Sequence, residues 1–239
     1  ISKKRVKSPV MTIAVTSSTT SDTDVSSCTP ESVLKDVFGY DVFRDGQGEV
    51  IHSVCKGSDA LVLLPTGGGK SLCYQIPALV RDGTAIVVSP LISLMQDQVE
   101  QLTALGVSAA YLNSSLDQDT QHGVTERLLA GKIDLLYVSP ERLLQFSFQQ
   151  LLKRIDIALF AIDEAHCVSH WGHDFRQDYR ALGQIKGKFP SIPIIGLTAT
   201  ADIATQVDIL TQLQLHEPLV YKGSFDRPNI RYRVMSKYK

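Results

Sequence analysis

Several features that would assign the chain to a class at once are missing or scarce. Its 239 residues contain no run of about 18 apolar residues, the length that a membrane span requires. The four cysteines lie far apart without a C-x-x-C pair, which argues against a disulfide framework and favours reduced thiols in a cytosolic protein. Neither sign of charge is in excess, since 24 basic and 25 acidic side chains leave a net charge of -1. A generally basic nucleic-acid coat protein is therefore excluded, and any contact with nucleic acid must come from a local patch.

The overall composition is that of a folded, soluble globular protein. Hydrophobic residues make up 44% and charged residues 21% of the chain, which excludes a disordered chain, a collagen-like fibre and a coiled coil. Residues 1–30 differ, because the stretch 12–30 is mostly Ser, Thr, Asp and Val and cannot bury enough apolar surface to fold. We expect a disordered lead-in there, with Met11 as a candidate start of the natural chain.

From Glu31 onward, short apolar runs alternate with longer segments of helical period. Six runs predict strands: Ala60–Leu64, Ala85–Ser89, Ala109–Leu112, Ile133–Val138, Ile157–Ile162 and Ile194–Leu197. Two segments between them place apolar residues on one helical face: Ile92, Met95, Val99 and Leu102 in the first, Ile203, Val207 and Leu210 in the second. Apolar strands separated by helices predict one α/β domain over residues 31–220, a parallel sheet with helices on both faces. Functional residues should follow the carboxyl ends of the strands.

A glycine-rich segment, Thr66-Gly67-Gly68-Gly69-Lys70-Ser71, follows the first predicted strand. The three glycines let successive backbone N–H groups point at phosphate oxygens, and a helix starting at Lys70 adds its positive N-terminal end. Lys70 can reach the β- and γ-phosphates of ATP, and the Ser71 hydroxyl can ligate Mg²⁺. The strict pattern G-x-x-x-x-G-K-[ST] requires glycine where this chain has Leu64. The alternative is a glycine-rich turn with an accidental Lys-Ser.

A second motif, Asp163-Glu164-Ala165-His166, follows the predicted strand 157–162. An Asp at the tip of a buried strand is where P-loop NTPases hold Mg²⁺, and an adjacent Glu can orient or deprotonate the attacking water. Taken alone, Asp-Glu after a strand is also a common helix N-cap. Together with the glycine-rich segment, the pair predicts an ATPase.

An aromatic segment begins soon after this motif. Trp171 and Phe175 lie four residues apart beside Arg176, a spacing suited to base stacking and backbone contact on single-stranded DNA. The alternative is a packed core pair on a short helix. Because residues 172–174 are Gly, His and Asp, which are poor core material, we expect an exposed loop.

Histidines in the same segment raise the question of zinc. His170 and His173 have ligand spacing and lie near His166 and Cys167. The Asp163–Glu164 pair assigns the region to ATP chemistry instead, so no zinc is expected.

The order of the motifs resembles that of the RecQ family of DNA helicases, within superfamily two. The matching segments are the glycine-rich and Asp-Glu-Ala-His motifs, Phe38-Gly39-Tyr40 with Phe43, Arg44 and Gln47, residues 89–98, 139–143, 170–176, 198–201 and 224–230. The resemblance extends from about residue 31 to residue 234, and Asp45 stands where that family usually has Pro. A glutamine amide such as that of Gln47 can pair with adenine N6 and N7. Tyr40 offers a ring for stacking, or is a half-buried tyrosine at a helix end.

The resemblance implies a RecA-like P-loop NTPase domain that forms the first lobe of an ATP-dependent helicase with 3′-to-5′ polarity, active in DNA recombination and repair. The implied ATP-binding residues are Tyr40, Arg44, Gln47, Thr66, Gly67, Gly68, Gly69, Lys70 and Ser71. The implied catalytic residues are Lys70, Asp163, Glu164 and His166. Ser71 and Asp163 would hold Mg²⁺, and the DNA-binding and coupling residues would be Trp171, His173, Phe175, Arg176, Thr198 and Thr200.

The expected partners are single-stranded and tailed duplex DNA, with no membrane, in the bacterial cytoplasm at the nucleoid. Residues 221–239 are expected to begin a linker into a second helicase lobe that this chain lacks, so the chain alone should not unwind DNA. Two other interpretations stay open. One is an RNA helicase or duplex translocase with the same lobe, and the other is a fragment that binds ATP and DNA without unwinding.

Overall fold

A computed structural model describes residues 28–113, 115–171, 176–224 and 233. The predicted lead-in up to residue 27, together with His173 and Phe175, lies outside these ranges. The strands are β1 (Ala60–Leu63), β2 (Thr84–Val88), β3 (Ala109–Leu112), β4 (Leu135–Val138), β5 (Ile157–Ile162), β6 (Ile194–Thr198) and β7 (Leu219–Lys222). The helices are α1 (Pro30–Asp36), α2 (Gln47–Cys55), α3 (Leu72–Val80), α4 (Ile92–Ala104), α5 (Gln118–Leu129), α6 (Pro140–Leu144), α7 (Phe146–Leu152), α8 (Gln177–Arg180), α9 (Gln184–Lys188) and α10 (Ile203–Gln212), with 3₁₀ helices η1 (Ala165–Val168) and η2 (Ala181–Gly183).

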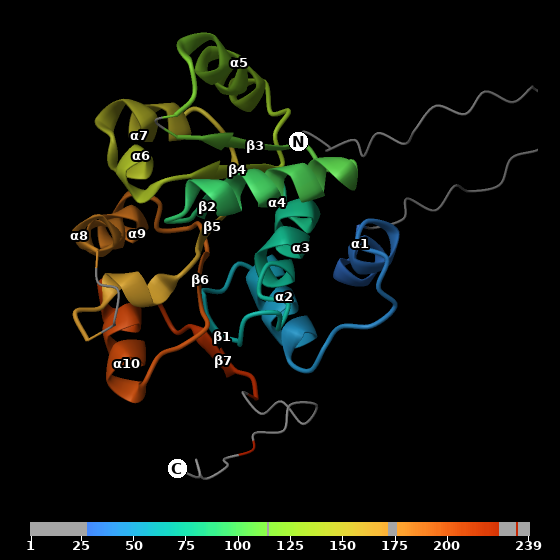
Figure 1. Ribbon diagram of the computed structural model, residues 1–239, viewed down its shortest axis with the longest axis vertical. Helices are drawn as coiled ribbons and strands as arrows, with labels where there is room; N and C mark the ends of the chain where they lie inside the picture. Colours follow the sequence, from blue (N-terminus) through green and yellow to red (C-terminus); the bar gives the residue numbers. More distant parts are fainter. Residues whose placement is uncertain (1–27, 114, 172–175, 225–232, 234–239) are drawn as a thin grey trace, which may run out of the picture.

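All seven strands pair in parallel in the order β3-β4-β2-β5-β6-β1-β7, which Figure 1 shows from top to bottom. The six predicted strands are confirmed, and so is the parallel α/β sheet. The seventh, β7, was not predicted. Its side chains are alternately half-buried and exposed, so it lacks the continuous apolar run of the others, and it extends past the predicted domain end at residue 220.

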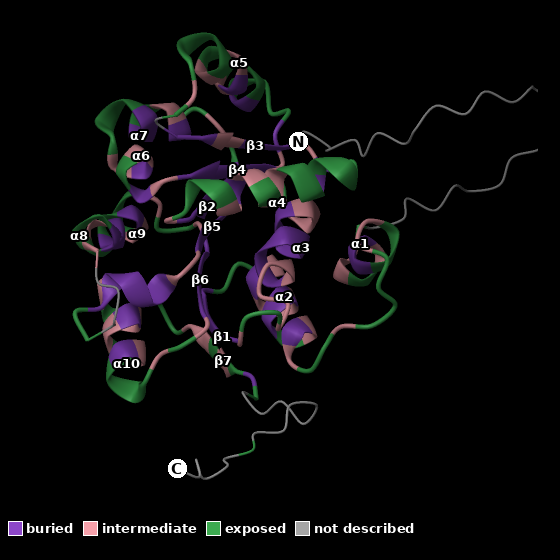
Figure 2. Ribbon diagram, viewed as in Figure 1, coloured by how far each residue is buried: buried purple, intermediate pink, exposed green. Residues whose placement is uncertain are grey.

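Helices cover both faces of the sheet, as predicted (Figure 1). Alternate residues of each strand point to opposite faces, so one sheet supplies two separate hydrophobic clusters. One cluster packs against α2, α3 and α4, and the other packs against α5 to α10. Burial is concentrated in the strands between these layers (Figure 2).

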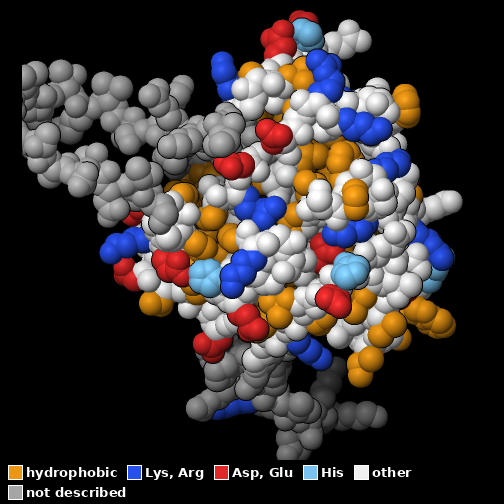
Figure 3. Space-filling model, turned by 180° about the vertical axis from the view of Figure 1, so that it is seen from behind, with side chains coloured by type: hydrophobic (Ala, Val, Ile, Leu, Met, Phe, Trp, Pro, Cys, Tyr) orange, Lys and Arg blue, Asp and Glu red, His pale blue; other side chains and the backbone are white. Residues whose placement is uncertain are grey.

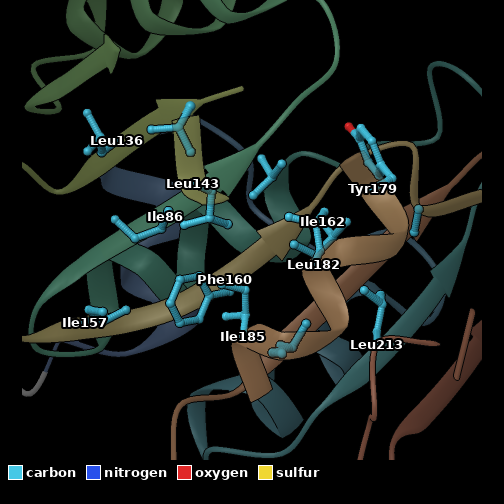
Figure 4. Close-up of a cluster of buried hydrophobic side chains, with 14 of the residues drawn as sticks. Ile86, Leu136, Leu143, Ile157, Phe160, Ile162, Tyr179, Leu182, Ile185 and Leu213 are labelled. Atoms are coloured by element: carbon cyan, nitrogen blue, oxygen red, sulfur yellow. The ribbon is translucent and has the colours of Figure 1, made fainter. Parts of the chain in front are cut away.

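In the cluster that packs against α5 to α10, Phe160 and Ile162 of β5 pack with Leu182 of η2 and Ile185 of α9 (Figure 4). Fully burying such side chains contributes about 1.5–3 kcal/mol each. None of the helices in the described ranges could span a membrane.

The helix α10 turns a different face to the core from the one that its apolar pattern indicates. Ile203 is 77% exposed and Val207 57% exposed, whereas Thr205 and Ile209 are buried. Of the three apolar residues on the predicted face, Leu210 packs against the core, whereas Ile203 and Val207 are exposed. The helix is oriented by its N-cap, where Asp202 accepts a hydrogen bond from the Thr205 backbone at 2.7 Å, and by burial of Ile209.

Candidate active site

The predicted phosphate, metal and coupling residues meet at the carboxyl ends of three adjacent strands. β6 lies between β1 and β5, so the glycine-rich loop after β1, Thr198 at the end of β6 and Asp163 after β5 come together at one edge. The Leu64 N–H donates to the Thr198 carbonyl at 3.1 Å, and the Asp163 N–H donates to the Val88 carbonyl at 2.9 Å. The start of the glycine loop and the Asp-Glu motif are therefore fixed to the sheet itself.

The glycine loop is a tight turn that leads into α3. Gly67 and Gly69 have φ of 79° and 81°, in the left-handed region that favours glycine. The regular helix begins at Leu72, so the predicted start at Lys70 was wrong. The reason is a tighter first turn, in which Cys73 N–H bonds to the Lys70 carbonyl at 3.0 Å. Lys70 and Ser71 still lie at the N-terminal end of α3, where a phosphate is favoured.

Lys70 and Asp163 form the charged centre of the site. The Lys70 ammonium donates to the Leu64 carbonyl at 3.0 Å, folded back on its own loop. Burial, followed by the neighbouring Glu164 carboxylate, raises the pKa of Asp163 to about 6, while Lys70 and His166 act in the opposite direction. One oxygen, Oδ1, accepts the Glu164 N–H at 3.0 Å, which orients the carboxylate.

The donor set fits Mg²⁺, a hard cation that prefers oxygen ligands. Ser71 supplies a hydroxyl at the N-terminal end of α3, and Asp163 supplies a carboxylate that burial makes costly to leave unpaired. These two residues would hold the ion. No group of three or more His, Cys, Asp and Glu side chains that could hold a metal occurs in the described ranges.

Glu164 is held in an unusual backbone conformation, with φ 50° and ψ 46°. Left-handed geometry is uncommon for residues other than glycine and is often found at functional sites. The Glu164 Oε2 lies 3.2 Å from His166 Nδ1. The hydrogen bond to the Cys167 side chain, followed by that to Glu164, raises the pKa of His166 to about 9. At 3.2 Å, the imidazole restrains the Glu164 carboxylate.

The same histidine connects the Asp-Glu motif to β6. His166 Nδ1 lies 2.9 Å from the Oγ1 of Thr198, which is fully buried. Thr198 Oγ1 in turn donates to the Thr200 carbonyl at 3.0 Å. The four predicted residues Glu164, His166, Thr198 and Thr200 thus form one hydrogen-bonded chain.

The predicted adenine-reading residues fall into two groups. Gln47 is 1% exposed, and both ends of its amide are used: Oε1 accepts the Arg44 N–H at 2.9 Å, and Nε2 donates to the Gly69 carbonyl at 3.1 Å. Arg44 Nη1 donates to the Gly67 carbonyl at 2.7 Å. In this structure Arg44 and Gln47 hold the glycine loop, so pairing with adenine requires Gln47 to leave it. Tyr40 lies four residues beyond the end of α1 and is 53% exposed, and its backbone N–H donates to the Leu34 carbonyl at 3.1 Å.

The turn that presents Arg44 and Gln47 is supported from β7, which the sequence analysis missed. Tyr221 donates its hydroxyl hydrogen to the Asp45 carbonyl at 2.7 Å. Asp45 occupies the position where the resemblance leads one to expect Pro. The Tyr221 hydrogen bond therefore restrains the turn in a different way.

Hydrogen bonds of the backbone hold both ends of the aromatic segment. Trp171 is 75% exposed, so the alternative of a core tryptophan is wrong. The Trp171 backbone N–H donates to Ser169 Oγ at 3.1 Å. Arg176, where the description resumes, donates its N–H to the Cys167 carbonyl at 3.0 Å.

Three further polar groups at this edge were not among the predicted site residues. Ser89 Oγ, Asn113 Nδ2 and Arg142 Nε are buried without a hydrogen-bond partner among the described residues, and they follow β2, β3 and β4. Buried donors without a protein partner are rare, and an ordered water or ion is the ordinary explanation for one. Ser89 and Arg142 lie in the segments 89–98 and 139–143, which resemble the RecQ family. This resemblance was the sequence signal that could have identified them.

The sheet is parallel, with a glycine-rich loop after β1, an acidic motif after β5 and a histidine that links this motif to Thr198 on β6 between them. These features define a P-loop NTPase of the helicase type. The DEAD/DEAH box helicase family profile matches residues 44–209. The chain belongs to this family.

Within the family, the chain is similar to RecQ helicases. It is 58% identical over 208 residues to ATP-dependent DNA helicase RecQ of Haemophilus influenzae, which covers 87% of this chain and 34% of that protein. It is 44% identical over 209 residues to RecQ-like DNA helicase BLM of Xenopus laevis, with 84% and 15% covered. The chain thus spans about a third of the length of the bacterial RecQ relatives. The predicted RecQ resemblance is confirmed.

Solved helicase structures share the fold. The helicase domain of Pyrococcus furiosus Hef matches with 20% identity and a TM-score of 0.53, over 75% of this chain and 37% of that chain. The DUF1998 helicase MrfA bound to DNA matches with 18% identity and a TM-score of 0.62, over 81% and 29%. The predicted RecA-like fold is confirmed.

Proposed function

We propose that this chain is the nucleotide-binding motor lobe of an ATP-dependent DNA helicase that translocates 3′ to 5′ in DNA recombination and repair. The observation that carries the proposal is the convergence of Lys70, Asp163 and Glu164 at the carboxyl ends of β1 and β5, on either side of β6. In the cell we place it in the cytoplasm, acting on the DNA of the nucleoid.

The roles of the residues follow from their positions. Lys70 turns from the Leu64 carbonyl to the β- and γ-phosphates of ATP, and the loop N–H groups bind phosphate oxygens. When bound between Ser71 and Asp163, Mg²⁺ would neutralise phosphate charge. Glu164 orients the attacking water, and its restrained backbone keeps the carboxylate in place between turnovers.

Coupling to DNA uses the chain from Glu164 through His166 to Thr198. The aromatic segment starts close to His166 and is anchored at Ser169, so a strand bound by Trp171 acts on the same short stretch that fixes Glu164. Single-stranded and tailed duplex DNA are the proposed partners.

An RNA helicase or duplex translocase is the second candidate, because a hypothetical ATP-dependent RNA helicase of Sulfolobus tokodaii shares the fold with a TM-score of 0.59. That likeness, at 21% identity, concerns the fold alone. The exposed Trp171 favours an unpaired strand over a duplex, because stacking requires free base faces.

Substitution of Lys70 by alanine tests the nucleotide site. The change removes the cation that faces the phosphates, and we expect affinity for a fluorescent ATP analogue with Mg²⁺ to fall at least about tenfold, as expected for loss of a charged hydrogen bond. Glu164→Gln is the matched control, because it keeps the shape of the site and should bind the analogue like wild type. Equal binding by Lys70→Ala and wild type would contradict the assignment.

A further inference from the structure

The segment between α1 and α2 ends in a tight turn just before α2. The Gln47 N–H donates to the Arg44 carbonyl at 3.0 Å, and Gly46 has φ 71° and ψ -14°. Of the two central residues, Asp45 and Gly46, only Gly46 has a positive φ. These features define a type II β-turn with Asp45 at its second position, where proline is favoured because its ring fixes φ. Aspartate provides no such restraint, so the turn depends on contacts from elsewhere.

Tyr221 on the edge strand β7 supplies two contacts to this turn. Its hydroxyl donates to the Asp45 carbonyl at 2.7 Å, and its ring packs on Gly46 so closely that a Cβ there would overlap the ring. Tyr221 is itself held in place, because β7 pairs with β1 and the Gly223 N–H donates to the Leu63 carbonyl at 2.9 Å. The strand β1 therefore carries the glycine loop at its own end and holds the turn through Tyr221.

The position of the turn decides where two side chains of the proposed nucleotide site can reach. Arg44 Nη1 donates to the Gly67 carbonyl at 2.7 Å, and Gln47 Nε2 donates to the Gly69 carbonyl at 3.1 Å. Gln47 has to leave Gly69 to pair with adenine, and that pairing depends on the direction of two hydrogen bonds. With the backbone of the turn fixed by Tyr221, only the side chain of Gln47 has to move.

We propose, resting on the proposed function, that Tyr221 is a positioning residue for base recognition, which holds the turn 44–47 so that Gln47 can pair with adenine. Tyr221 acts on the base only through the turn. The edge strand β7 thereby contributes to the choice of nucleotide, although none of its residues belongs to the glycine loop or to the Asp-Glu motif.

The first test uses Tyr221→Phe in the 239-residue chain, which removes the hydroxyl and keeps the ring on Gly46. Fluorescent ATP and GTP analogues are titrated with Mg²⁺, and melting temperatures are recorded. We expect affinity for the ATP analogue to fall about threefold to tenfold, as for loss of one hydrogen bond. Affinity for the GTP analogue should stay at the wild-type value, because guanine has an acceptor, O6, where adenine has the N6 donor that pairs with a glutamine amide.

The second test restores the restraint within the turn itself. Asp45 is exposed, so Asp45→Pro costs no burial, and proline fixes φ at the second position of a type II turn. In the Asp45→Pro background, Tyr221→Phe should lower affinity for the ATP analogue by less than about twofold, because the two changes act on the same turn. An undiminished loss in this background would overturn the inference, since it would show that Tyr221 does not act by restraining the turn.

Tyr111→Phe is the matched control. Tyr111 lies on β3, the edge strand at the opposite end of the sheet from β7 (Figure 1), and its hydroxyl accepts from Gln96 Nε2 at 3.4 Å. This variant should bind both analogues like wild type. Wild-type affinity for the ATP analogue in Tyr221→Phe would overturn the inference. So would an equal loss for both analogues together with a lower melting temperature, because that result indicates a purely structural role.

The behaviour of the wild-type chain separates the inference from the proposed function. If the wild-type chain binds both analogues equally, the turn does not read the base and the inference fails, while the Lys70→Ala comparison still decides the phosphate site. If the wild-type chain binds neither analogue, the proposed function fails and the inference fails with it.

Discussion

Asp163 illustrates how a single site residue weakens the fold that contains it. Burial raises the pKa of its carboxyl from 3.8 to about 6, so ionisation of this group is less favourable in the folded chain than in the unfolded chain. The stability that the protonated group provides is complete below a pH of about 3.8 and is lost as the pH rises through about 6. At neutral pH, without Mg²⁺, the ionised carboxylate therefore destabilises the folded state.

Asp163→Asn should accordingly stabilise the nucleotide-free protein. The amide keeps an oxygen that can accept the Glu164 N–H, and it removes a buried charge worth about 1–3 kcal/mol. The melting temperature should rise by about 2–10 °C at a pH of about 7.5, and the rise should shrink at a pH of about 4.5. Circular dichroism melts in EDTA at both pH values measure the effect.

Asp202→Asn is the control, because the pKa of Asp202 is lowered whereas that of Asp163 is raised. Hydrogen bonds from Thr205 lower the pKa of the Asp202 carboxyl at the N-cap of α10, so loss of its charge should bring no stabilisation at neutral pH. An Asp163→Asn protein that melts no higher than wild type at neutral pH would show that the carboxylate is better compensated than its burial indicates.

At the scale of elements, strands that are buried on both faces can be predicted from the sequence. β1, β2 and β5 are recognisable because every side chain in them is buried, which yields continuous apolar runs. The edge strand β7 is only half-buried and carries no such run. The orientation of α10 could not be predicted either, because helical period shows that a face exists and does not show which neighbours cover it.

For the site, the sequence predicted positions that a local motif specifies and missed contacts between distant segments. The positions of Lys70 and Asp163 after β1 and β5 could be predicted from motif and strand position. Gln47 was assigned to adenine, but its amide bonds the Gly69 carbonyl, a contact between segments that no local pattern specifies. The support from Tyr221 to Asp45 likewise joins two distant parts of the chain.

Trp171→Ala tests the aromatic segment as a DNA-contact element. Because this side chain is exposed, its removal should leave the melting temperature unchanged while weakening single-stranded DNA binding by about 1–3 kcal/mol, the value of one stacked base. Trp171 is the single tryptophan of the chain, so quenching of its intrinsic fluorescence by DNA reports the contact directly.

Phe146→Ala on α7 is the matched control, since Phe146 is also 75% exposed but follows α6 rather than the Asp-Glu motif. Fluorescence anisotropy of a labelled oligonucleotide compares the two variants. Equal DNA affinity in Trp171→Ala and Phe146→Ala would remove the segment from the DNA-contact role.

At the scale of the whole molecule, charge does not attract DNA in general. The net charge is -1, and basic and acidic side chains are interspersed over the face shown in Figure 3. Binding must therefore depend on local contacts, and loss of one contact should be visible without a non-specific background.

On its own, a polypeptide of these 239 residues should lack the unwinding activity of a helicase. The described residues form one sheet with one glycine loop, and the chain covers about a third of its bacterial RecQ relatives. In phosphoryl transfer, an arginine supplied by a second element is worth about 10³–10⁵ in rate, and translocation requires two lobes that close and open on a strand. We therefore expect nucleotide binding without ATP-dependent unwinding. A strand-displacement assay on a tailed duplex, with full-length RecQ of Haemophilus influenzae as the positive control, measures this. Robust unwinding by the 239-residue chain would contradict this prediction, because it would show that the described lobe unwinds DNA without a second lobe.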